Sequence, residues 1–154
     1  MKCELFVVGK TTEKYLQEGI NEYLKRLTHY LPSVTVIISP SSKTDAPKAI
    51  GEEGESMLKR IQPRDFVIVL DENGTLLSSK DLATKLEKWL TEGYSKIIFV
   101  TGGAYGIAES VKKRANFILS ASKFTFTHQM IRLILTEQIY RAMTIVKNES
   151  YHHG

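Results

Sequence analysis

Apolar and polar positions fall in blocks along the chain, and these blocks predict alternating strands and helices. Short runs rich in β-branched and aromatic residues predict strands, whereas the longer segments between them carry apolar residues at helical spacing. Because the strand runs are apolar almost throughout, a sheet built from them must be covered on both faces. We therefore predict an α/β fold with a mostly parallel sheet and helices on both faces. The predicted strands are residues 3–9, 34–39, 66–70, 96–101 and 117–121.

Helical periodicity marks three segments between these strands. The first follows Thr11 and Thr12, and either hydroxyl is a predicted N-cap. The second covers residues 46–61, and the third begins at Ser79, which we predict as its N-cap.

A fourth helix is predicted over residues 128–146, with Thr127 as its N-cap. Its apolar residues cover far more of the circumference than the stripe of an ordinary surface helix. Such a helix must be buried on two sides. We expect its own sheet on one side and a second subunit on the other, which predicts a homodimer.

Length and composition indicate one soluble domain over residues 1–154. The chain is 42% hydrophobic and 25% charged, and no apolar run approaches the ~20 residues that cross a membrane. The N-terminus predicts a strand and not a signal peptide. The single Cys3 rules out an internal disulfide and fits the reducing cytoplasm, where we expect the protein and expect Cys3 to be a core residue.

Charge is distributed unevenly along the chain. The net charge is +4, but residues 1–77 hold ten Lys and Arg against eleven Asp and Glu, whereas residues 78–154 hold eleven against six. A basic second half is compatible with a polyanionic partner and equally with a solvated basic surface.

Three predicted strand ends carry residues suited to ligand binding, because ligands of open α/β sheets bind beyond the carboxyl ends of strands. They are LDENG (70–74), VTGGAYG (100–106) and LSASKFTFTHQ (119–129). In the first, Asn73-Gly74 predicts a turn with positive φ, or Asp71 faces a ligand. In the second, the glycines form a turn or admit a flat ligand close to the backbone. Their GGxxG spacing and the absence of a lysine at the following helix argue against a phosphate site.

The sequence gives little support for a metal site or for nucleophilic catalysis. One Cys and four scattered His give no metal-ligand spacing, and nothing marks an activated nucleophile. The terminal YHHG is a frayed end or a functional tail on the residues alone.

Taken together, LDENG, FVTGGAYG, residues 119–142 and YHHG resemble the SPOUT-class RNA methyltransferases, and among them the ribosomal large-subunit methyltransferase H family. The resemblance covers essentially the whole chain. It implies a homodimer with a C-terminal trefoil knot, a rare exception to the rule against knotted chains. It further implies S-adenosylmethionine as cofactor and N3 of a pseudouridine in helix 69 of 23S rRNA, within the ribosome, as the methylated atom.

The same resemblance implies site residues. Positions expected at the cofactor are Leu70, Gly102, Gly103, Gly106, Ser122, Lys123, Phe124, Thr125, Phe126 and Thr127. Candidate catalytic residues are His128, Arg132, Tyr151 and His152. We expect Arg132 to stabilise charge or hold a phosphate, and His128 or the tail to orient the base, with the proton acceptor left unassigned. Tyr151 would stack on a base, and Lys112, Lys113, Arg114 and Lys123 are possible phosphate contacts.

Three alternatives remain at this stage. The nearest is a SPOUT methyltransferase acting on tRNA or on another rRNA base. A Rossmann-type oxidoreductase is disfavoured by the glycine spacing and by its position after the fourth strand. The third is an RNA-binding dimer without enzymatic activity.

Overall fold

The computed structural model describes residues 1–154 and contains five strands and five helices. The strands are β1 (Cys3–Val8), β2 (Ser33–Ile38), β3 (Phe66–Leu76), β4 (Ile97–Val100) and β5 (Phe117–Ser120). The helices are α1 (Lys14–Thr28), α2 (Ala46–Lys59), α3 (Ser79–Thr91), α4 (Glu109–Arg114) and α5 (Met130–Val146). The predicted order of strands and of the four predicted helices is confirmed, and the structure adds bounds for the short helix α4 between β4 and β5.

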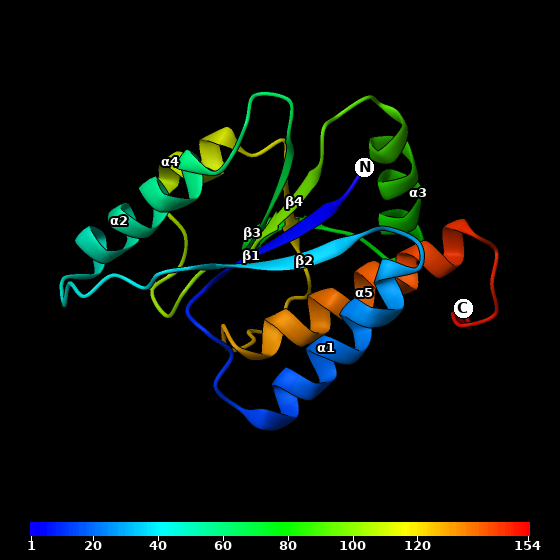
Figure 1. Ribbon diagram of the computed structural model, residues 1–154, viewed down its shortest axis with the longest axis horizontal. Helices are drawn as coiled ribbons and strands as arrows, with labels where there is room; N and C mark the ends of the chain where they lie inside the picture. Colours follow the sequence, from blue (N-terminus) through cyan, green and yellow to red (C-terminus); the bar gives the residue numbers. More distant parts are fainter.

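All strands belong to one sheet in the order β2-β1-β4-β3-β5, and every neighbouring pair is parallel. The carboxyl ends of all five strands therefore lie at the same edge, which we call the carboxyl edge. The helices lie on both faces of the sheet (Figure 1), as the apolar character of the strands predicted.

Alternate residues of each strand supply two separate cores. Leu5 and Phe99 face α1, α3 and α5, where they pack in a cluster that includes Leu27, Leu86 and Ile139. The residues next to them in sequence face the other way and pack on α2 and α4; this second cluster includes Phe6, Val100, Met57 and Val111. The period-2 alternation of strands thus divides the helices between the two faces.

The predicted turn at Asn73-Gly74 is wrong. β3 continues to Leu76, and after a bulge between Leu70 and Thr75 it pairs again with β5. Gly74 does not have positive φ. Instead it lies against β5, because a Cβ at this position would be 2.7 Å from the carbonyl oxygen of Ile118.

Two predicted N-caps are corrected by the structure. Glu13 precedes α1 without a side-chain cap, while the Thr11 hydroxyl accepts a hydrogen bond from Arg132. Ser78, not Ser79, caps α3 by accepting from the Asp81 N–H at 3.0 Å.

The start of α5 is close to the prediction. The helix begins at Met130, and residues 128–129 form a turn before it. The Thr127 hydroxyl accepts a hydrogen bond from the Met130 N–H at 3.0 Å, so Thr127 performs the capping function expected of it.

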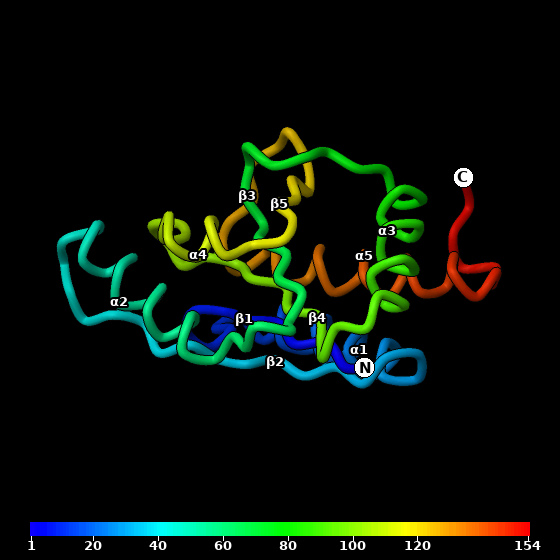
Figure 2. The backbone as a smooth tube through the Cα atoms, turned by 90° about the horizontal axis from the view of Figure 1, so that it is seen from above, coloured from blue at the N-terminus to red at the C-terminus, as the bar shows by residue number.

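α5 packs on the sheet between α1 and α3 (Figure 1). Leu135, Ile139 and Met143 form its buried face, and Gly19 allows α1 to approach closely, since a Cβ there would be 2.9 Å from Leu133 Cδ1. The chain then ends at the side of the molecule opposite to α2 and α4 (Figure 2). No helix combines the length and the apolar character needed to span a membrane.

Candidate active site

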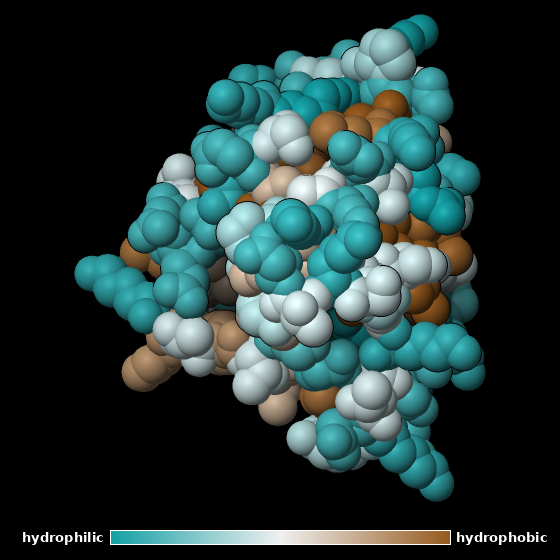
Figure 3. Space-filling model, turned by 90° about the vertical axis from the view of Figure 1, so that its left-hand side faces the viewer, coloured by the Kyte–Doolittle hydropathy of each residue, from teal (hydrophilic) through white to brown (hydrophobic).

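A cavity of about 490 Å³ opens at the carboxyl edge beyond β3, β4 and β5; we call it the first cavity. Its size lies within the range of small-molecule sites. On this side of the molecule, apolar side chains show in separate small areas between polar ones (Figure 3). The three strand ends chosen from the sequence all contribute to its lining, which includes Leu70, Asp71, Gly102, Gly103, Gly106, Ser122, Phe124, Thr125, Phe126, Thr127 and His128.

The glycine loop after β4 forms one wall. Gly106 has φ of +101°, a conformation that favours glycine, and its N–H donates to the Gly103 carbonyl at 3.1 Å. A Cβ on Gly102 would lie 2.8 Å from the backbone carbon of Gly106. The loop can therefore fold back on itself only when residue 102 lacks a side chain.

The segment 122–127 forms the opposite wall. The Ser122 hydroxyl accepts from the Phe124 N–H at 2.9 Å, and the Ser122 carbonyl accepts from the Ser120 hydroxyl at 3.0 Å. Phe124 lines the cavity although the residue is 79% exposed. Lys123 is the one member of the segment that does not line the cavity.

The first cavity contains carboxylates but no Lys or Arg. Asp71 and Glu72 are among its lining residues, and the Lys112 ammonium lies outside the lining, 3.6 Å from Asp71 Oδ1. A phosphate-binding site would bring cationic side chains or a helix N-terminus to the anion. This lining suits a neutral or positively charged ligand.

His128 stands between the first cavity and a second one, and lines both. Burial lowers the pKa of its imidazole below the usual 6.5, and the positive charge of Arg132 lowers the pKa further. The neutral form of the ring therefore predominates at pH 7.

Arg132 lies behind the site and does not line the first cavity. Its side chain is fastened to the end of β1: it donates to the carbonyl oxygens of Val8 at 2.6 Å and Gly9 at 3.0 Å, and to the Thr11 hydroxyl at 3.0 Å. It is only 2% exposed, and burial lowers the pKa of the guanidinium. These bonds tie the start of α5 to the end of β1.

The predicted tail residues lie at the other end of α5. Arg141 donates to both oxygens of Glu137, and its Nη1 is 3.1 Å from His152 Nδ1. The Tyr151 ring packs on Arg141, with the guanidinium carbon 4.8 Å from the ring centroid. Burial and a hydrogen bond with Tyr23 raise the pKa of Tyr151 to about 12, so the phenol stays neutral at physiological pH.

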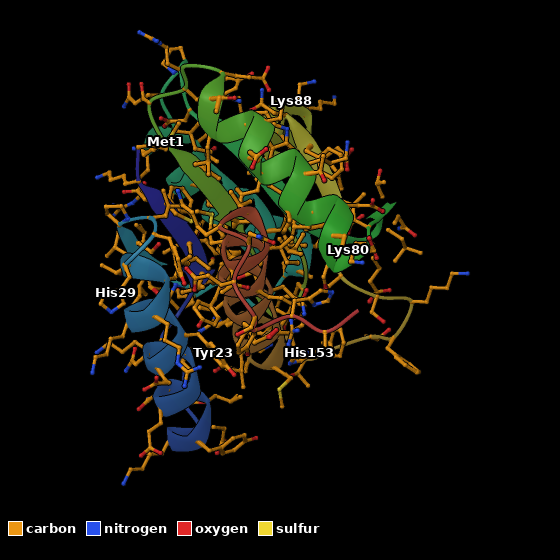
Figure 4. All side chains as sticks on the ribbon, turned by 90° about the vertical axis from the view of Figure 1, so that its right-hand side faces the viewer. Met1, Tyr23, His29, Lys80, Lys88 and His153 are labelled. Atoms are coloured by element: carbon orange, nitrogen blue, oxygen red, sulfur yellow. The ribbon has the colours of Figure 1, made fainter.

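This group of Glu137, Arg141, Tyr151 and His152, which we call the tail cluster, does not contact the first cavity. The C-terminal segment crosses α5 there, and His153 lies in this view between Tyr23 of α1 and Lys80 of α3 (Figure 4). The structure thus brings His128 to the cavity but leaves Tyr151 and His152 of the same chain at a distance from it.

Comparison with known proteins identifies the family. The family model described as a predicted SPOUT methyltransferase matches residues 1–152. Ribosomal RNA large subunit methyltransferase H of Parabacteroides distasonis is 48% identical over 99% of both chains. The proteins of the same name from Christiangramia forsetii and Desulforamulus reducens are 46% and 43% identical, again over 99% of both chains.

The chain belongs to the SPOUT methyltransferase family. It is therefore a methyltransferase, and its parallel α/β fold carries the C-terminal trefoil knot of that family. A solved structure, a probable methylase family protein from Haemophilus influenzae Rd KW20, has the same fold with a TM-score of 0.53 at 13% identity. It aligns over 99% of this chain and 70% of its own.

The proposed phosphate contacts of this SPOUT methyltransferase fall into two groups. Lys112 pairs with Asp71, and Arg114 donates to the carbonyl oxygens of Gln62 and Asp65, so both side chains have partners within the chain. Lys113 and Lys123 are exposed and remain candidates for contact with RNA. No three His, Cys, Asp or Glu side chains are grouped to hold a metal ion.

Sequence reasoning missed the second cavity entirely. It is formed by the end of β1, the loop after β2, α2 and the glycine loop, and its charged lining residues are Lys10 and Glu53. The signal that would have pointed to it is the sequence VVGK at 7–10, a strand followed by glycine and lysine at the same carboxyl edge.

Proposed function

We propose that this chain is an S-adenosylmethionine-dependent methyltransferase that methylates N3 of a pseudouridine in helix 69 of 23S rRNA. The relatives named ribosomal RNA large subunit methyltransferase H, which match almost end to end, support an rRNA substrate. The observation that carries the proposal is a cavity with carboxylates and without basic groups, beside a histidine that is neutral at pH 7.

The residues of the first cavity fit S-adenosylmethionine. A sulfonium is a cation, and Asp71 and Glu72 supply the only full charges in the lining. The walls at Leu70, Gly103 and segment 122–127 offer apolar contacts and backbone groups to an adenosyl moiety. When bound, this cofactor supplies a methyl group on positively charged sulfur with a neutral thioether as leaving group.

The protein itself must orient the acceptor base and accept the proton that the base loses. Holding a nucleophile at about 3 Å from its target lowers the activation free energy by several kcal/mol. Methylation at N3 replaces an N–H, so one proton must leave the base. The neutral ring of His128 is available to accept it, because burial and Arg132 keep the pKa of His128 below its ordinary value.

We further propose that the enzyme works as a homodimer in which the tail cluster of one subunit serves the first cavity of the other. Ile131 at the start of α5 lines the first cavity, whereas Glu137 and Arg141 of the tail cluster lie about 9 and 15 Å further along the helix axis and line neither cavity. The half-buried apolar residues Ile131, Ile134 and Ile145 on α5 offer surface for such contact.

A methylation assay tests the function. The protein is incubated with methyl-labelled cofactor and with intact ribosomes, isolated subunits or tRNA, and the modified nucleoside is identified by mass. We expect label in 23S rRNA as methylated pseudouridine. Label in tRNA alone would establish the alternative, a SPOUT methyltransferase acting on tRNA.

Mixing two inactive variants tests the shared site. One variant ends after Ser150, and the other carries Gly102→Ala in the cavity wall. If each subunit supplies half of a site, mixed dimers regain one functional site and activity returns on co-refolding. Two variants that stay inactive together, with dimers present by light scattering, would refute the arrangement.

A further inference from the structure

The second cavity, about 640 Å³, opens at the carboxyl edge beyond β1 and β2. It is adjacent to the first cavity, since Gly103, Ala104 and His128 line both. A ligand in the second cavity would therefore have only this shared wall between itself and a ligand in the first. Two adjoining sites are what a transfer between two molecules requires.

Glu53 is held in place with one oxygen free. Its Oε2 accepts from the Ser41 N–H at 3.0 Å, which fastens the carboxylate to the loop after β2. Its Oε1 accepts no hydrogen bond within the chain and lies 3.4 Å from where a Cβ on Gly103 would be. The free acceptor oxygen is thus next to the wall that the two cavities share.

Gly103 keeps this space open. A side chain at residue 103 would begin 3.2 Å from Val8 Cγ1 and would extend between the glycine loop and Glu53. The missing side chain therefore belongs to the second cavity as much as to the first.

The remaining lining suits a nucleobase. Tyr105 is 59% exposed, and Lys10 brings an ammonium group. Gln129 is fixed, since its side chain accepts from the Thr12 N–H at 3.0 Å and donates to the Lys10 carbonyl at 3.3 Å. Proteins that modify or read single bases take them out of the stack, place them on aromatic rings and bond to their edges.

We propose that the second cavity receives the acceptor base, and that Glu53 selects pseudouridine over uridine. This inference rests on the proposed function. Pseudouridine is joined to ribose through carbon, so it carries an N1–H in addition to the N3–H, whereas N1 of uridine is bonded to the sugar. Glu53 Oε1 accepts the N1–H, Tyr105 stacks on the ring, and N3 faces His128 and the methyl donor.

The donor and acceptor pattern makes this a selective contact. A site built to bond a polar group discriminates strongly against the analogue that lacks it, because its own group is then left unpaired. A bond to a charged acceptor supports discrimination of about 10- to 100-fold. Uridine offers no hydrogen at N1 and leaves the Glu53 oxygen without a partner.

The test compares Glu53→Gln with wild type on ribosomes that carry pseudouridine or uridine at the target position. Because the amide oxygen of Gln can still accept the N1–H but carries no charge, we expect the ratio of the two kcat/KM values to fall about 3- to 10-fold in Glu53→Gln. The affinity for S-adenosylhomocysteine, measured by calorimetry, stays within about twofold because Glu53 does not line the first cavity. An unchanged ratio would overturn the role of Glu53.

Glu52→Gln is the matched control. Glu52 precedes Glu53 on α2 and accepts from the Ser41 hydroxyl at 2.6 Å, but it does not line the second cavity. It should leave the pseudouridine preference as in wild type. Equal loss in both variants would point to the loop after β2 and contradict direct contact by Glu53.

Two further variants test the cavity itself. Tyr105→Ala should raise the KM for ribosomes about 10-fold while Tyr105→Phe restores it, since stacking needs the ring and not the hydroxyl. Ser39→Trp should fill the second cavity and abolish turnover. Its affinity for S-adenosylhomocysteine should stay at the wild-type value. Full turnover of Ser39→Trp would overturn the site. Failure of wild type to methylate any ribosome would instead overturn the proposed function and this inference with it.

Discussion

The two ends of α5 differ in almost every respect. At its start the chain forms open loops around two cavities, with glycines, an exposed Phe124 and a neutral His128. In its second half the side chains are closely engaged: Glu137 and Arg141 form the tail cluster with the terminal residues, and this cluster lines neither of the two cavities. The first cavity provides space without Lys or Arg, whereas the tail cluster provides a cation and rings but lines neither cavity. An anionic RNA base needs both, which is why a second subunit is part of the proposed function.

The largest effect is expected from Arg132→Met. The substitution leaves the Val8 and Gly9 carbonyls without their donor, and each buried unsatisfied group costs ~1–3 kcal/mol. We expect the free energy of unfolding to fall by about 3 kcal/mol and Tm by about 6–12 °C. Thermal unfolding followed by calorimetry measures both quantities. Because Arg141 is partly exposed, Arg141→Met should cost much less, and equal losses would remove the contrast between the two ends.

Gly102→Ala should weaken cofactor binding about 100-fold, or ~2.7 kcal/mol. The added Cβ would lie 2.8 Å from the Gly106 backbone, so the loop must move and distort the first cavity. Titration with S-adenosylhomocysteine measures the loss. Gly51→Ala is the control, since a Cβ at Gly51 meets nothing within 4 Å; weakened binding there would mean that any added methyl group has this effect.

Arg141→Met should lower kcat/KM on ribosomes about 30-fold, in keeping with the loss of a charge-assisted contact. The affinity for S-adenosylhomocysteine should stay at its wild-type value, because Arg141 lies at the far end of α5 from the first cavity. Parallel measurement of both quantities checks this. A fall in cofactor affinity comparable to the fall in turnover would show that the two ends are not functionally separate.

The order of elements and the two cores follow directly from sequence, because apolar runs and helical periodicity are local properties. The extension of β3 to Leu76 does not follow from the sequence, since it depends on β5 lying alongside Gly74. The three late strand ends could be assigned to one cavity because parallel strands end at the same edge. The hydrogen-bond partners of Arg132 could not be predicted from the sequence, because its donors reach carbonyl oxygens 123 and 124 residues away in the chain.

The composition of the second cavity could not be predicted from the sequence for a related reason. Its walls come from five separated segments, and neither VVGK nor the glycine loop shows by itself that α2 completes the cavity. Glu53 sits within an ordinary amphipathic helix, so only its position next to Gly103 distinguishes it from the neighbouring Glu52.

The smallest effect concerns acidity. In the folded protein the pKa of His128 lies below 6.5, so the unfolded chain binds more protons as pH falls through that value. His128 therefore contributes stability that is present above about pH 6.5 and is lost towards lower pH. Between pH 7 and 5.5, Tm of wild type should fall slightly more than that of His128→Gln. Parallel curves for the two proteins would show that this ring is not shielded from water.

The bonds from Arg132 to the end of β1 join the first strand of the protein to its last helix. Contacts between such distant positions form only after a large loss of chain entropy, and topologies rich in them assemble slowly. Here the pairing also has to wait until the C-terminal segment has been threaded. We therefore expect the hydrogen bonds of Arg132 to form late in folding, and the site beside them to be complete only in fully folded molecules.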